Sequence, residues 1–309
     1  MGVKLSKKEL IILVLVLIIC FVSTYKIHFN NPFPYHHDEW QHLGISTQIV
    51  DKGYNINTNP YTGEKQFHTD LESGFHIFLS NVIILTQNDL IFSYKYLASI
   101  FAVLTGFLFF VLMYDWTKNY WASILSILIF TFLKTNVNIL GKDFFIPLSF
   151  ALPFILAFIY YFTKALKKKN SSYFYLSFVI LSVIFFIHPP SFMILIFPTL
   201  IELIFHHKFI KKIFKKRIFL VIPFIVVLIY LLIWKGTIIH SLQYLLGLIY
   251  FEQGWGKLEI KFFIPLLYGI IYTVLALTSI KWTSKNKFRF FLFSAFISLF
   301  ITTLFNSYN

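Results

Sequence analysis

The sequence has little charge. Charged residues make up only 13% of its 309 residues, whereas hydrophobic residues make up 58% and aromatic residues 21%. The surface of a soluble protein needs about twice that charged share. The composition therefore excludes a soluble enzyme and indicates a membrane protein.

Cysteine and nucleotide-binding motifs are equally scarce. The single cysteine, Cys20, lies in an apolar run, so an internal disulfide is excluded. There is no glycine-rich phosphate loop of the P-loop or dinucleotide-binding type, and no strict zinc-binding spacing such as HExxH. Any chemistry must therefore come from other polar residues.

Long apolar segments dominate the sequence. A helix needs about 20 mostly apolar residues to cross a membrane, and about nine segments approach that length. They are residues 9–27, 90–114, 119–141, 144–163, 172–189, 190–206, 217–235, 262–281 and 288–306. A diproline, Pro189-Pro190, divides two of them and predicts a tight hairpin, because proline cannot donate a helix hydrogen bond. We predict an all-α polytopic membrane protein.

The distribution of charge predicts the orientation of these spans. With the N-terminus in the cytoplasm, the cytoplasmic connections hold most of the Lys and Arg residues, including residues 167–169 and 211–217. All acidic residues except Glu9, Asp115 and Glu202 then lie on the opposite side. The net charge of +14 thus reflects topology and requires no nucleic-acid partner. We expect a multi-pass plasma-membrane protein whose basic runs face lipid headgroups.

The predicted organisation has five parts. They are a retained signal-anchor helix (1–27), an extracytoplasmic loop (28–89), transmembrane core helices (90–235), a second extracytoplasmic loop (236–261) and C-terminal transmembrane helices (262–309). The first loop is too long for a simple connector and holds more than half of the carboxylates. We therefore expect the active face to be extracytoplasmic.

The first loop contains two predicted interfacial helices. Apolar positions recur at helical spacing from His37 to Val50, and Gly53 supplies a stop signal. Residues 74–86 are apolar but too short to cross the membrane comfortably. If they did cross, every later loop would move to the opposite side of the membrane, and the lysine-rich runs would then face outward. We therefore place residues 74–86 on the membrane surface.

The most informative cluster in this loop is Asp38-Glu39, flanked by His37 and His42. Carboxylates beside hydrocarbon are costly to keep without a use, and one of them can serve as a general base. On a helix, Asp38 and His42 share a face while Glu39 points about 100° away, so only one acid faces a substrate. Alternatively, both acids simply occupy a first helical turn, where negative charge suits the helix dipole.

Three further residues are expected on the extracytoplasmic side of the membrane, where the Asp38-Glu39 cluster lies. Lys142 and Asp143 follow the third span, and His188 precedes the diproline. Each also fits a structural role, as a marker of the water boundary or a turn residue. A divalent metal ion held by Asp38 and His42, with His37 or a distant carboxylate such as Asp143, is a further possibility.

The order of these features resembles the GT-C superfamily of membrane glycosyltransferases, which includes protein O-mannosyltransferases, oligosaccharyltransferase catalytic subunits and aminoarabinose lipid A transferases. The resemblance covers residues 8–205. It comprises a first span, an acidic motif at Pro34 to Trp40, an interfacial helix, the run from Tyr96 to Leu108, an outward acid at Asp143 and a His-Pro hairpin.

The resemblance implies inverting transfer of a sugar from a polyprenyl-phosphate carrier to an acceptor glycan, lipid or protein outside the cytoplasm. Asp38 then resembles the loop carboxylate that acts as base, with Glu39 as its adjacent alternative. Asp143 matches the second acidic position, and Lys142 beside it and His188 become candidate contacts for the donor phosphate. His37 and His42 join them as candidate substrate-binding residues.

Two other functions compete with this interpretation. Many GT-C members have more spans and a soluble C-terminal domain, so a non-catalytic subunit of the same fold is one alternative. A lipid or solute transporter is the other, although the spans hold almost no ionisable residues and show no paired, Gly/Pro-broken helices. The sugar, the acceptor and the choice between Asp38 and Glu39 stay open at this point.

Overall fold

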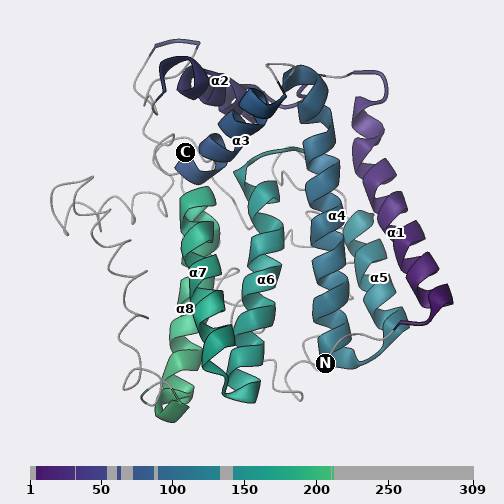
Figure 1. The fold of residues 1–309 in the computed structure, drawn as a ribbon, viewed down its shortest axis with the longest axis vertical. Coiled ribbons are helices and arrows are strands. Elements are labelled where there is room, and N and C mark those ends of the chain that lie inside the picture. The colour runs from purple at the N-terminus through teal and green to yellow at the C-terminus, as the bar shows by residue number, and fades with distance from the viewer. Residues whose placement is uncertain are drawn as a thin grey trace, which may run out of the picture. The chain divides into compact units, whose positions relative to one another are not determined.

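The computed structural model describes residues 5–31, 33–53, 61–63, 72–86, 90–132, 142–209 and 211. Every regular element in these ranges is helical (Figure 1). The elements are α1 (Lys7–Tyr25), the 3₁₀ turn η1 (Lys26–His28), α2 (His37–Lys52), α3 (Ser73–Leu85), α4 (Leu90–Thr117), α5 (Tyr120–Thr131), α6 (Pro147–Lys168), α7 (Ser171–Ile187) and α8 (Pro189–Phe205).

Within the described residues, three helical segments are long and apolar enough to cross a membrane: Lys7–His28, Tyr94–Thr117 and Pro147–Lys168. Helices α3, α5 and α7 are apolar but shorter. The chain is therefore all-helical in its described part and has the helices of a membrane protein. The predicted spans 217–235, 262–281 and 288–306 and the loop 236–261 lie outside the described residues.

Local sequence signals explain where several helices begin and end. Ser6 and Glu9 form a capping box at the start of α1, in which each side chain accepts a backbone N–H of the other. Asn119 caps α5 by accepting the N–H of Ala122. Gly53 ends α2 with a φ of 75°, a left-handed conformation that costs glycine little. The helices expected from His37 and over residues 74–86 are both present.

The break between helices that was expected at the diproline is present as a sharp junction. Helix α7 ends at Ile187 and α8 begins at Pro189, so a single residue, His188, separates them. Proline suits the first position of a helix, because its missing N–H would have no partner there. In the third predicted span, 119–141, helix α5 ends at Thr131, and residues 133–141 lie outside the described residues.

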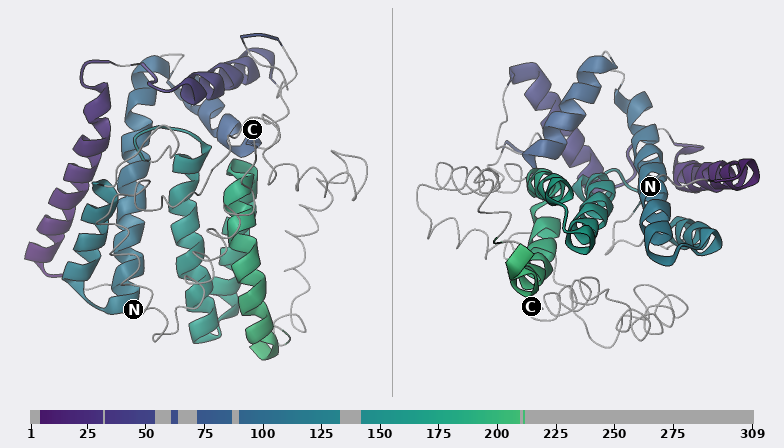
Figure 2. Two further views of the ribbon diagram at one scale, coloured as in Figure 1. Left: turned by 180° about the vertical axis from the view of Figure 1, so that it is seen from behind. Right: turned by 60° about the horizontal axis from the view of Figure 1, so that its bottom comes forward.

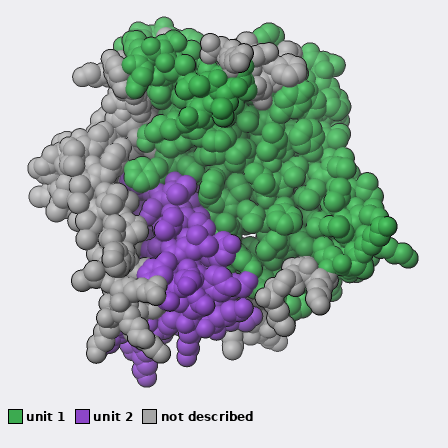
Figure 3. Space-filling view, viewed as in Figure 1, with its two compact units in different colours: residues 1–160, 186–189 green, residues 161–185, 190–309 purple. Residues whose placement is uncertain are grey.

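The chain divides into two compact units (Figure 3). Unit 1 comprises residues 1–160 and 186–189, and unit 2 comprises residues 161–185 and 190–309. In unit 2, Phe174 packs against Phe162 and Phe178. The Nε2 atom of His206 lies 3.5 Å from Oε2 of Glu202, one helical turn earlier. All of the candidate site residues belong to unit 1.

In unit 1, helices α1, α4 and α5 pack side by side (Figure 2). Their shared core consists of Leu13, Val16, Phe110, Tyr120, Ile124 and Ile127. Gly106 allows α4 to approach α5 closely, because a Cβ there would lie 3.1 Å from the side chain of Ile127. The Tyr120 hydroxyl donates a 2.6 Å hydrogen bond to the Glu9 carbonyl, which joins α5 to the start of α1.

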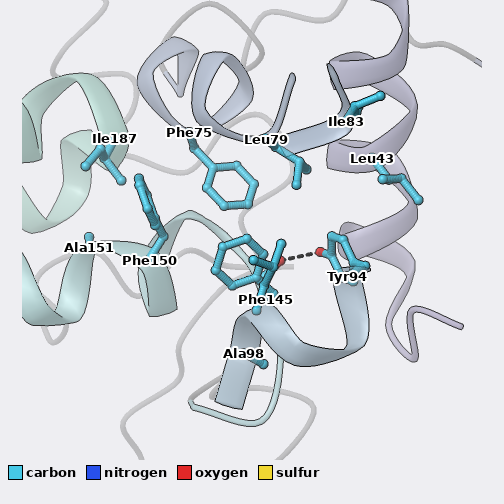
Figure 4. Packing of buried hydrophobic residues seen from close by; sticks show 11 residues of the cluster. Leu43, Phe75, Leu79, Ile83, Tyr94, Ala98, Phe145, Phe150, Ala151 and Ile187 are labelled. Atoms are coloured by element: carbon cyan, nitrogen blue, oxygen red, sulfur yellow. Dashed lines mark hydrogen bonds between the residues drawn. The ribbon is translucent and has the colours of Figure 1, made fainter. Parts of the chain in front are cut away.

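A second core lies beneath α2 and α3 (Figure 4). Phe75 and Leu79 of α3 are fully buried there with Phe145, and the Tyr94 hydroxyl donates to the Phe145 carbonyl. Helix α3 also begins against the end of α7, since a Cβ on Gly74 would lie 2.9 Å from the Phe186 carbonyl oxygen. This core fixes α2 and α3 beside the segment that precedes α6.

Candidate functional site

The start of α2 is organised by Glu39, which is fully buried. Its Oε2 accepts the backbone N–H groups of Tyr35 at 2.8 Å and His36 at 3.0 Å. Its Oε1 accepts the N–H of Phe145 at 2.7 Å. Both carboxylate oxygens are therefore engaged with backbone donors, and Glu39 connects the start of α2 to the segment before α6.

Asp38, its neighbour, has a different environment. Its side chain is 45% exposed and lies 3.5 Å from Nδ1 of His36 and 3.7 Å from Nδ1 of His37. The His37 side chain is itself 85% exposed. Of the two adjacent acids, Asp38 is thus the one that a substrate can reach.

The predicted pair Lys142 and Asp143 lies at the end of unit 1 that contains the start of α2. Lys142 is buried, and its Nζ donates to Oδ1 of Asp143 at 2.6 Å. The Glu39 hydrogen bond to Phe145 and the ring contact between His36 and Phe144 tie this segment to the start of α2. These contacts bring the segment of Asp143 to the same end of unit 1 as the start of α2, whereas the side of the membrane on which the two acids lie stays a prediction.

A second polar cluster joins α2 to the start of α3. His42 Nδ1 lies 3.0 Å from Nε2 of His76 and 3.8 Å from Oε2 of Glu72. Glu72 and His76 are buried, and His42 is largely so. Ser80 reinforces the junction by donating to the Ser46 carbonyl at 3.0 Å. The cluster is therefore held by two helices that pack tightly against each other.

Burial controls the charge of this cluster. It raises the pKa of Glu72 to about 8, with a further contribution from the negative charge of Asp38. Burial and the nearby imidazoles of His76 and His188 hold the pKa of His42 well below its usual value. Burial likewise raises the pKa of Glu39, although the three backbone N–H groups oppose this shift. Without a cation, the cluster therefore favours neutral side chains at neutral pH.

His188 lies at the same end of unit 1, close enough to affect the titration of His42. Ile187 beside it belongs to the core that contains Phe75. His188 thus lies near the α2–α3 cluster.

Sequence reasoning proposed a metal set of Asp38, His42 and Asp143. The structure groups His42 with Glu72 and His76 instead, while Asp38 contacts His36 and His37. Glu72 and His76 were not singled out, although they are four residues apart: Glu72 lies two residues before the predicted helix 74–86, and His76 lies in its first turn. That spacing was a usable signal, but nothing in the sequence paired it with His42.

Comparisons with known proteins give no assignment. No protein-family model, curated protein or solved structure matches this chain. Functional conclusions therefore come from the residues and their geometry.

Proposed function

We propose that the protein is a membrane glycosyltransferase that moves a sugar from a polyprenyl-phosphate carrier to an acceptor on the extracytoplasmic face. One observation carries the proposal: an accessible carboxylate, Asp38, stands at the same end of the apolar helices as the ion pair between the buried Lys142 and the partly buried Asp143. A lipid-linked donor already lies in the bilayer, so a site at the end of membrane helices suits it.

Asp38 is the general base in this proposal. It takes a proton from the acceptor hydroxyl or amine as that group attacks the anomeric carbon, and the bond from the sugar to the phosphate oxygen breaks. Glu39 is a positioning residue, because its oxygens are occupied by backbone N–H groups. It holds Asp38 and the segment of Lys142 in place.

The leaving phosphate needs positive charge or hydrogen-bond donors. Lys142 supplies them in this proposal, since an ammonium has three N–H donors and its contact with Asp143 uses one. His37, His42 and His188 stand at the same end and complete the proposed substrate-binding region. The described parts of the three candidate spans bury no Asp, Glu, Lys or Arg, which argues against a transporter.

The test is an assay in vesicles that contain the full chain and a polyprenyl-phosphate sugar, with release of the lipid phosphate as readout. Asp38→Asn should lower release by about 100-fold or more, the usual contribution of a general base. Asp51→Asn is the matched control, because Asp51 is exposed in the last turn of the same helix. It should leave release unchanged.

Equal release by the Asp38→Asn variant and the native chain, at equal protein level, would remove Asp38 from the chemistry. No release by the folded native chain with any polyprenyl-linked sugar would favour the alternative of a non-catalytic subunit.

A further inference from the structure

We infer that His42, Glu72 and His76 form a binding site for Zn²⁺ or a similar divalent transition-metal ion. The inference goes beyond the proposed sugar transfer and does not depend on it. Three groups that could act as ligands come from two helices, and one ligand atom from each lies within 4.8 Å of the other two. Among the described residues, this is the group of three that has such geometry.

The distances suit a single ion placed between the three side chains. Two ligands about 2.0–2.1 Å from zinc at a tetrahedral angle lie about 3.3 Å apart. The separation of His42 Nδ1 from His76 Nε2 is 3.0 Å, and from Glu72 Oε2 it is 3.8 Å. These values bracket the expected spacing, so small side-chain rotations suffice to close the site.

The ligand chemistry points to a transition metal and away from Mg²⁺ or Ca²⁺. Two imidazole nitrogens and one carboxylate oxygen are a set that zinc takes in proteins, whereas Mg²⁺ and Ca²⁺ prefer oxygen ligands alone. Three protein ligands also leave a fourth position for water or a substrate atom. Such an open position is typical of catalytic zinc sites and not of closed structural ones.

The local structure positions these ligands before any ion arrives. Glu72 is the N-cap residue that precedes α3, and its carbonyl accepts the N–H groups of Phe75 and His76. Phe75, between the two α3 ligands, is fully buried and contacts the His42 ring. The Ser80 bond to the Ser46 carbonyl fixes α3 against α2. The two buried imidazoles and the buried carboxylate lose hydration, and a cation bound between them would compensate for that desolvation.

The experiment measures metal binding by the purified full chain in lipid nanodiscs after treatment with EDTA. Zn²⁺ is titrated in competition with a chromophoric indicator. We expect one tightly bound Zn²⁺ per chain and an affinity at least tenfold lower in each of His42→Gln, Glu72→Gln and His76→Gln. Glu202→Gln and His206→Gln are the matched controls, because that pair in unit 2 has the same chemistry without a third partner among the described residues. They should bind Zn²⁺ like the native chain.

A second measurement needs no variant and guards against loss of folding. Cu²⁺ bound to the native chain should show nitrogen coupling from two imidazoles in electron paramagnetic resonance spectra. Native-like Zn²⁺ affinity in folded site variants, or bound metal without two imidazole nitrogens, would overturn the inference. Failure of the sugar-transfer assay leaves these readouts unaffected, so the two proposals fail separately.

Discussion

The two cores of unit 1 bury different kinds of side chain. Between α1, α4 and α5 the buried side chains are apolar or carry hydroxyl groups, and none of them is Asp, Glu, Lys, Arg or His. Around α2, α3 and the segment before α6, the protein buries Glu39, Glu72, His76 and Lys142. A buried ionisable group is costly unless it is paired or hydrogen-bonded. The contrast indicates that the core between α1, α4 and α5 serves to pack helices. The core around α2 and α3 instead keeps buried ionisable side chains together at one end of unit 1.

Glu39→Gln should have the largest effect of the substitutions that test this contrast. An amide nitrogen would meet backbone N–H donors at one of the two oxygen positions, so at least one buried hydrogen bond is lost and a donor faces a donor. We expect a loss of about 2–4 kcal/mol in the free energy of unfolding. Thermal unfolding in detergent, followed by tryptophan fluorescence, measures it.

Asp38→Asn is the control for that substitution, since it makes the same chemical change one residue earlier at a half-exposed position. Its stability should stay within about 0.5 kcal/mol of the native chain. Equal destabilisation by the two variants would contradict the division of roles between these acids.

Gly74→Ala should have an intermediate effect. Its Cβ would lie 2.9 Å from the carbonyl oxygen of Phe186, a backbone atom that can move only with its helix. We expect a cost of about 1–3 kcal/mol from overpacking. The comparison is Gly106→Ala in the apolar core, where the nearest atom belongs to the side chain of Ile127 at 3.1 Å.

The Ile127 side chain can shift, and alanine is more favourable than glycine inside a helix by about 1 kcal/mol. Gly106→Ala should therefore leave stability nearly unchanged. If it proved as costly as Gly74→Ala in the same thermal scans, the polar end would be no more tightly constrained than the apolar core.

Glu72→Gln should have little effect on stability near pH 4 and should stabilise the folded chain increasingly as pH rises. Burial raises the pKa of Glu72 to about 8 in the folded chain, against about 4.3 in an unfolded chain. Between these values the folded state binds more protons than the unfolded state, so stability falls as pH rises from about 4 to about 8. The substitution removes this dependence.

In EDTA, the Tm of Glu72→Gln should therefore exceed that of the native chain by an amount that increases between pH 5 and pH 8. A difference of about 3 °C corresponds to about 1 kcal/mol in a protein of this size. A constant difference across this range would mean that the Glu72 carboxyl titrates as it does in the unfolded chain.

Much of the fold could be predicted, because its signals are local. The helices α2 and α3 follow from apolar spacing and, for α2, from the Gly53 stop. The α7–α8 junction follows from the diproline. The first span was placed from residue 9, whereas the Ser6 and Glu9 capping box starts α1 at Lys7. The candidate site was less predictable. Asp38 and Glu39 looked interchangeable, and His42 was placed with Asp38 because helical spacing shows only partners on the same helix.

The sequence by itself determined that the described part of the chain is helical and has apolar segments long enough for a membrane, because hydropathy and capping act over a few neighbouring residues. The tertiary structure decided which polar groups meet. It buried Glu39 against the Phe145 N–H, left Asp38 accessible and brought His42 to Glu72 and His76. The reason is that these contacts join segments about 30 to 100 residues apart, and packing of Phe75, Phe145 and their neighbours sets their distances.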